Sequence, residues 1–329
     1  MKSRNIAFDL LKLFAIFLVL WGHCIQHMKV TNTDEPIYLF IYSFHMPLFM
    51  MISGYFSISS LQMKFWPFVK KKFIQLLLPC VSWYLLAYVL PKLALMLLHK
   101  EGGAFSLSSL DVLLHNFWFL KSVFICYVLA YFGFKGKWIG ILLSILISQI
   151  IPMFSVSFLY PAFLVGIVLS KGDLLEDDRK RVIIMVSSFL IWAGLLVKMR
   201  WTDFNVPISF LISNSELIMD RLLRIFIGSF GALFWISLYT TLFRKSSNTR
   251  VASLAKYGKY TLGVYILQTY ILESGLCKVI SLDKFSLLMS DFIVSPIIAL
   301  TVLVICILII MITERYKLMA LLLWGYKSK

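Results

Sequence analysis

The sequence predicts an all-α, polytopic membrane protein with about ten transmembrane helices. Of its 329 residues 60% are hydrophobic and only 15% are charged, against about 25% charged residues in an ordinary soluble domain. The apolar residues also form uncharged blocks, such as residues 294–312. A hydrocarbon layer of about 30 Å needs roughly 20 such residues in a helix. Lipid offers the backbone no hydrogen-bond partner, so each block is predicted to be helical.

Ten apolar blocks are long enough to be considered as spans, and together they predict one transmembrane domain over residues 1–329. The fifth and sixth are short and meet at residues 151–152. The predicted spans are 6–28, 37–58, 73–98, 112–133, 137–153, 156–170, 181–199, 221–243, 258–280 and 290–313.

The loops between the blocks predict the orientation. With the N-terminus in the cytoplasm, 21 lysine and arginine residues fall on the inside and 7 on the outside. Cytoplasmic loops carry the excess of these residues in membrane proteins. Both termini are therefore predicted to be cytoplasmic. The same distribution explains the net charge of +16 as a topology signal, and no nucleic-acid partner is expected.

The five cysteines are scattered without the spacing of a metal or redox motif, and three or more lie in apolar blocks. They are interpreted as small apolar side chains. We expect no metal and no bound cofactor.

The first span carries polar residues along one face. Asp9 precedes Lys12 by about one turn, so the two side chains can pair. His23 follows Lys12 by 11 residues, which places both on one helix face to within roughly 20° and about 16 Å apart along the axis. Lys and Asp near a helix end can reach the membrane surface. That explanation does not cover His23, which is predicted to lie in the outer half of the membrane.

The second span runs inward and carries His45, about eight residues from its outer end. His23 is about five residues from the same end of its own span, so the two histidines are predicted to share one depth. Pro47 interrupts the helix ladder nearby, which occurs where backbone lies beside a cavity. A lone buried histidine is usually structural, whereas two at matching depth favour a functional site.

These motifs, taken together, resemble the acyltransferase 3 family of bacterial membrane acyltransferases, closest to its fucose 4-O-acetylase-like branch. The resemblance extends over the whole chain. It rests on Arg4, Asp9, Lys12 and His23, and then on the segments 44–49, 53–56, 68–79, 118–120 and 257–265.

The sequence departs from the family pattern at three positions. Lys12 stands where the best-known branch has arginine, which keeps the charge but loses bidentate binding of an anion. The family's basic pair falls on Lys72 and Gln75, so its second charge is missing. Gln268 stands where many relatives have histidine. Because His23 is retained, activity is still expected.

The resemblance implies a membrane O-acyltransferase of the bacterial cytoplasmic membrane. It implies acetyl-CoA as the donor, and a hydroxyl of a cell-surface glycan or of its lipid-linked precursor as the acceptor. His23 is the expected catalytic base, with His45 beside it. Asp9, Lys12 and Lys72 are expected on the donor path, and Lys70, Lys71, Arg244, Lys245 and Arg250 are further candidates to hold the donor's phosphates. The expected acceptor-binding residues are Trp118, Lys121, Arg221 and Arg224.

Alternatives remain open at this point. Arg221 and Arg224 can instead pair with Asp220 and Glu216. The whole protein can instead be a transporter of a small polar metabolite, with the intramembrane charges along its path. No internal repeat or matched pair of broken helices supports the transporter. A purely structural membrane protein would leave the buried histidine and lysine unexplained.

Overall fold

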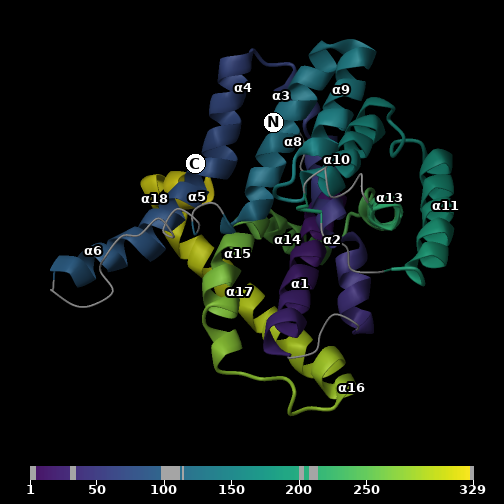
Figure 1. The fold of residues 1–329 in the computed structure, drawn as a ribbon. Helices are drawn as coiled ribbons and strands as arrows, with labels where there is room; N and C mark the ends of the chain where they lie inside the picture. The colour runs from purple at the N-terminus through teal and green to yellow at the C-terminus, as the bar shows by residue number, and fades with distance from the viewer. Residues whose placement is uncertain are drawn as a thin grey trace.

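The computed structural model describes residues 5–29, 35–97, 112, 115–199, 204–206 and 214–326, and Arg4 lies outside them. Within these residues the chain is helical and contains no strand. The helices pack as a bundle, with α11 along one side and α6 projecting from another (Figure 1). The prediction of an all-α polytopic membrane protein is confirmed.

The elements follow one another along the chain with short interruptions of π-helix or 3-10 helix. They are α1 (Ile6–Met28), α2 (Pro36–Tyr55), α3 (Ile58–Leu61), α4 (Phe65–Lys72), η1 (Phe73–Leu77), α5 (Leu78–Tyr84), η2 (Leu85–Val89), α6 (Leu90–Leu97), α8 (Trp118–Lys135), α9 (Lys137–Ile150), α10 (Val156–Lys171), α11 (Asp178–Leu196), α13 (Ser215–Phe243), α14 (Thr249–Ala255), η3 (Lys256–Tyr260), α15 (Thr261–Gln268), η4 (Thr269–Glu273), η5 (Leu276–Lys278), α16 (Leu287–Met289), η6 (Ser290–Val294), α17 (Ser295–Thr313) and α18 (Lys317–Trp324).

Each of the ten predicted spans overlaps a helix. Among the described residues, six helical segments are long and apolar enough by themselves to cross a membrane: Ile6–Met28, Pro36–Tyr55, Phe65–Met96, Trp118–Lys135, Glu216–Phe243 and Leu287–Thr313. The apolar helices α9 and α10 are shorter, as the sequence predicts for the pair that meets at residues 151–152.

Local sequence explains where several helices begin. The side chain of Asn5 accepts a hydrogen bond from the backbone N–H of Phe8 at the start of α1. Asp177, Asn214 and Asn248 do the same for α11, α13 and α14. A side-chain oxygen at this position pairs one of the backbone N–H groups that a first turn leaves unsatisfied.

Glycine sets the closest helix packing in the bundle, between α2 and α10. A Cβ atom added at Gly54 would lie 2.0 Å from the carbonyl oxygen of Phe163, and one added at Gly166 would lie 2.0 Å from that of Met51. Small residues allow membrane helices to approach this closely. The contact fixes α2, which carries His45, against the centre of the bundle.

The start of α1 and the end of α17 lie at the same end of the bundle. Gly258 of η3 packs against the backbone of Asp9, and Lys259 pairs with Glu314 at 3.0 Å. At the other end, the N–H of Leu282 donates to the carbonyl of Met28, and Lys29 pairs with Asp291. Figure 1 shows α16 at this second end, away from α18. We call the first end the predicted cytoplasmic end.

A fusion experiment tests the sidedness. A cytoplasmic fluorophore fused after Lys329 is expected to be bright, and alkaline phosphatase fused there is expected to be inactive, because the basic loops favour a cytoplasmic C-terminus. Alkaline phosphatase inserted between α1 and α2 should be active. The reverse pattern would overturn the predicted orientation and the outer location of His23.

Candidate active site

His23 lies on α1, and its nearest charged neighbour is Glu273, from the far end of the chain. Its ring nitrogen Nδ1 is 2.8 Å from Glu273 Oε1, and the two side chains are 19% and 25% exposed. The pair is therefore partly open instead of sealed in the core. The preceding residue, Gly22, lets the ring of Tyr42 lie against α1, since a Cβ there would be 2.8 Å from that ring.

Glu273 is the partner of His23 that the sequence analysis does not predict. It ends the π-helical turn η4, whose wider turn brings Gln268 and Glu273 together five residues apart. Gln268 Nε2 donates a hydrogen bond of 2.8 Å to Glu273 Oε1. The signal was present, because Glu273 is an acidic residue in a predicted span, where such residues are rare and often functional.

The side chain of His45 is more buried than that of His23. Its side chain is buried, with Nδ1 2.8 Å from the carbonyl oxygen of Ile41. Its ring meets that of Tyr42 edge to face, and the Tyr42 hydroxyl donates to the side chain of Gln26. Since Tyr42 also packs on Gly22, α2 lies against the part of α1 that carries His23.

Arg221 and Arg224 lie on α13 and are both buried. Arg224 donates to the carbonyl oxygen of Tyr42 at 2.9 Å and to the sulfur of Met199 at 3.0 Å. Its guanidinium lies over the ring of Phe158, and that of Arg221 over Phe204. The structure thus brings Arg224 to the Tyr42 side of His45. Its contacts are with α2, α10 and Met199, and none of them is with Glu216.

Trp118 and Lys121 lie at the start of α8. Lys121 Nζ donates to the carbonyl oxygen of Asn116 at 2.6 Å and lies 5.5 Å from the centre of the Phe154 ring. The carbonyl of Trp118 accepts a hydrogen bond from Ser122. These contacts place both residues at the junction of α8 with the turn before α10.

Asp9 and Lys12 form the expected pair at the predicted cytoplasmic end. Lys12 Nζ is 3.2 Å from Asp9 Oδ1 and 5.2 Å from the centre of the Phe56 ring. Lys12 and His23 are eleven positions apart on α1, so the structure keeps the two groups apart along one helix.

A cavity of about 260 Å³ opens near the predicted cytoplasmic end. Lys72 and Lys259 are its basic lining residues. The side chain of Lys72 is buried, and its Nζ lies 3.6 Å from the centre of the Tyr127 ring. Lys70 and Lys71 are exposed, and neither lines the cavity. The lining residues are Ser53, Lys72, Gln75, Leu76, Val123, Tyr127, Lys259, Tyr260, Leu262, Gly263, Ile310, Trp324, Gly325 and Tyr326.

The C-terminal helix α18 forms one wall of this cavity, which the sequence did not predict. Gly325 ends α18 with a φ of 70°, and a Cβ there would lie 2.6 Å from the carbonyl oxygen of Gln75. Only glycine fits this close, left-handed turn. The Tyr326 hydroxyl donates to Glu314 at 2.8 Å, so Glu314 joins this wall to Lys259.

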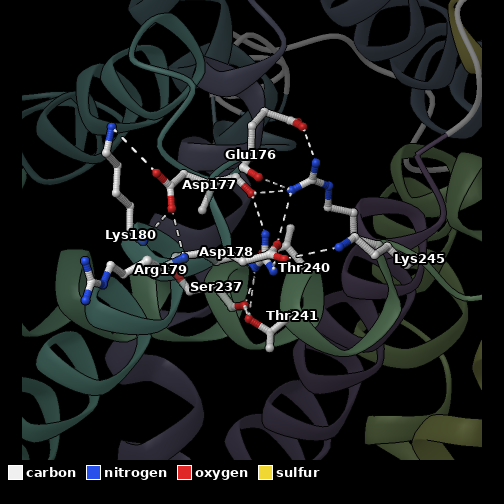
Figure 2. Close-up of polar contacts among 12 residues, drawn as sticks. Glu176, Asp177, Asp178, Arg179, Lys180, Ser237, Thr240, Thr241 and Lys245 are labelled. Atoms are coloured by element: carbon white, nitrogen blue, oxygen red, sulfur yellow. Dashed lines mark hydrogen bonds and ion pairs between the residues drawn. The ribbon is translucent and has the colours of Figure 1, made fainter.

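The basic residues after α13 have other partners. Arg244 pairs with Glu176 at 2.5 Å, and Lys245 pairs with Asp178 at 3.1 Å. Figure 2 shows this network, in which the acidic turn before α11 meets the end of α13. Hydrogen bonds from Arg181 and Lys245 lower the pKa of Asp178 below its usual value. Arg244 and Lys245 therefore tie α11 to α13, and neither lines the Lys72 cavity.

The described residues form a polytopic membrane protein. His23 and Glu273 make a partly exposed pair, and a cavity lined by Lys72 and Lys259 opens near the predicted cytoplasmic end. Residues 5–313 match the acyltransferase domain family Acyl_transf_3. The chain therefore belongs to this acyltransferase family, as its resemblance implied.

Two relatives carry the name nodulation protein NolL. The protein from Sinorhizobium fredii (strain NBRC 101917 / NGR234) is 33% identical over 185 residues, which cover 52% of this chain and 50% of the relative. The protein from Mesorhizobium japonicum (strain LMG 29417 / CECT 9101 / MAFF 303099) is 36% identical over 141 residues, which cover 39% of this chain and 35% of the relative. The matched region thus spans half or less of these relatives. No solved structure matches the chain.

Proposed function

We propose that this protein is an O-acetyltransferase of the bacterial cytoplasmic membrane. It moves an acetyl group from acetyl-CoA to a hydroxyl of a cell-surface glycan or of its lipid-linked precursor. The observation that carries the proposal is the His23–Glu273 pair at 2.8 Å, in a chain of the acyltransferase family. A histidine beside a carboxylate is an arrangement that general-base catalysis of acyl transfer uses.

The chemistry follows from the lone pair of the neutral His23 ring. The ring nitrogen that carries no hydrogen accepts the proton of the acceptor hydroxyl as its oxygen attacks the thioester carbonyl. The new C–O bond forms, the C–S bond breaks, and the proton passes from His23 to the leaving thiolate. Glu273 stabilises the imidazolium that exists between these two steps. Gln268 holds Glu273 through its hydrogen bond of 2.8 Å.

The Lys72 cavity supports a donor that enters from the predicted cytoplasmic end. CoA carries its phosphates at the end opposite the thioester, so its binding site needs cations away from the catalytic base. Lys72 and Lys259 line the cavity. Among the ion pairs of the described segments, none involves Lys72. A buried lysine that faces an aromatic ring and no carboxylate can bind a phosphate as a point charge.

One helical segment links the cavity with the catalytic pair. Leu262 and Gly263 of α15 line the cavity, and Glu273 follows at the end of η4. Ten or eleven helical residues span about 16 Å, which is the same separation that α1 gives between Lys12 and His23. An extended donor lying along α1 and α15 would carry its thioester toward His23, with Asp9 and Lys12 beside its path.

The acceptor is proposed to approach from the other end, where His27 next to this pair is exposed. His45, Tyr42 and Arg224 form a connected polar wall on α2 and α13. In this proposal that wall orients the sugar, with Arg221 one turn nearer the start of the same helix. Trp118 and Lys121, at the start of α8, remain the other proposed acceptor contacts.

An acetyl-transfer assay separates this proposal from the transporter. Purified protein in lipid vesicles is supplied with acetyl-labelled acetyl-CoA and a lipid-linked oligosaccharide, and the acetylated product is measured by mass spectrometry. Acetyl transfer that requires the protein, but no solute gradient across the vesicle membrane, supports the acetyltransferase. Absence of transfer and of donor hydrolysis, together with uptake of an unmodified sugar, would favour the transporter.

Substitution of Lys72 tests the donor site. Lys72→Met is expected to raise the KM for acetyl-CoA about 10- to 100-fold, because a hydrogen bond to a charged group contributes roughly 1.5–3 kcal/mol. Lys72→Arg keeps the charge and should lose less. Lys70→Met is the matched control, since Lys70 is exposed on the same helix. Equal KM values for the Met variants at 70 and 72 would place the donor elsewhere.

A further inference from the structure

The catalytic pair has a third neighbour that the proposed reaction does not use. His27 lies one turn after His23 on α1, with their ring centres 5.4 Å apart. A ring nitrogen from each histidine and a carboxylate oxygen of Glu273 all lie within 4.8 Å of one another. Two histidines four residues apart on a helix are a spacing that metal sites use, because both rings leave the same face.

The donor set favours a borderline divalent ion. Two imidazoles and one carboxylate are the protein ligands of many zinc sites that keep a fourth position open. A tetrahedral ion with Zn–N and Zn–O bonds of about 2.0–2.2 Å holds its ligand atoms roughly 3.4 Å apart. The three atoms here lie within 4.8 Å of one another, so side-chain rotation has to bring them together by about 1 Å. Gln268 already donates to Glu273 Oε1, which is the outer hydrogen bond that orients a metal-binding carboxylate. Mg²⁺ prefers oxygen ligands and should not compete.

We infer that His23, His27 and Glu273 form a binding site for Zn²⁺ or a similar ion, and that the bound ion blocks acyl transfer. The ion is acquired from outside and is distinct from a resident cofactor. His27 is exposed and the other two ligands are partly exposed, so the site is accessible to ions. The inhibitory half of this inference rests on the proposed role of His23, whereas the binding half does not.

Inhibition follows from the electrons of the imidazole ring. A neutral imidazole has one nitrogen with a free lone pair and one that carries a hydrogen. A metal ion on either nitrogen takes the only available lone pair, and the remaining nitrogen keeps its hydrogen. His23 then has no position left to accept the proton of an acceptor hydroxyl. The ion also takes Glu273 away from stabilising the imidazolium.

The test compares wild type with His27→Ala and His27→Gln. Zn²⁺ binding to the purified protein in detergent is measured by equilibrium dialysis with elemental analysis, which requires no activity. Wild type is expected to bind one Zn²⁺ per chain at this site, and both variants to bind it at least about 10-fold more weakly, since even loss of an outer partner costs 10- to 100-fold. His115→Ala, at an exposed histidine before α8, is the matched control and should bind as wild type does.

The inhibitory half is measured by titrating Zn²⁺ into the acetyl-transfer assay. Half-inhibition is expected at a Zn²⁺ concentration at least about 10-fold higher in the His27 variants than in wild type, and EDTA should restore the wild-type rate. Equal binding by wild type and both His27 variants would overturn the site. Binding that depends on His27 without inhibition, or loss of wild-type activity in EDTA alone, would overturn the blocking role. A protein that binds Zn²⁺ through His27 but shows no transfer would fail the proposed function and leave the site standing.

Discussion

The His23→Ala variant is expected to lose about 10²- to 10⁴-fold in the rate of acetyl transfer, because that is the contribution of a well-placed general base. The imidazole lies 2.8 Å from Glu273 and is partly exposed, so its removal takes away a reactive group and leaves little empty core. Expression and membrane insertion should stay normal. The measurement is the acetyl content of the surface glycan by mass spectrometry, normalised to the amount of protein in the membrane.

The His45→Ala variant distinguishes catalysis from packing. His45 is buried against Tyr42 and the Ile41 carbonyl. A purely structural histidine there would lower the yield of protein, whereas the proposed contact with the acceptor also lowers the activity of each molecule. Near wild-type acetylation by His23→Ala, at matched protein level, would rule out the proposed mechanism. The transporter would then be the better interpretation.

The Glu273→Gln variant is expected to show the second large effect, a fall in kcat of about 10²- to 10⁴-fold with little change in the KM for acetyl-CoA. The substitution keeps the shape of the side chain but removes the charge that stabilises the protonated His23 ring. In the well-studied Ser-His-Asp triad, replacement of the carboxylate by its amide costs about 10⁴-fold. Kinetics of the purified variant in lipid vesicles measure both constants.

Two further variants control the Glu273 result. Glu273→Asp keeps the charge on a shorter side chain and should recover part of the rate. Gln268→Ala removes only the hydrogen bond that orients Glu273, so a smaller fall, about tenfold, is expected. A neutral glutamine in a membrane span costs less to bury than a carboxylate, so Glu273→Gln should be at least as abundant as wild type. Unchanged kcat in Glu273→Gln would show that the pair is structural.

Local patterns in the sequence predicted most of the fold. Blocks of about 20 apolar residues form helices in lipid whatever their neighbours are, so all ten predicted spans overlap helices. The Asp9–Lys12 pair was predictable for the same reason, since residues three apart on a helix are neighbours. That His23 and His45 share one depth stays a prediction, made by counting residues from the outer ends of two adjacent spans.

The tertiary structure decided which residues meet across the bundle. Nothing in the local pattern around His23 indicates Glu273, 250 residues later, because helix packing and the π-helical turn η4 bring them together. The sequence offered three adjacent lysines, and only Lys72 faces the cavity, because one helix face alone points inward.

What the sequence by itself determined is therefore the class of protein, the helices and the face of α1 that carries His23. These features depend on the free energy of placing backbone polar groups and charges in lipid, which is determined for each segment separately. What only the tertiary structure decided is the set of partners: Glu273 and His27 at His23, α18 at the Lys72 cavity, and Glu176 at Arg244. Partners far apart in the chain depend on the packing of whole helices, and packing uses glycines and side-chain shapes that leave no periodic signal in one sequence.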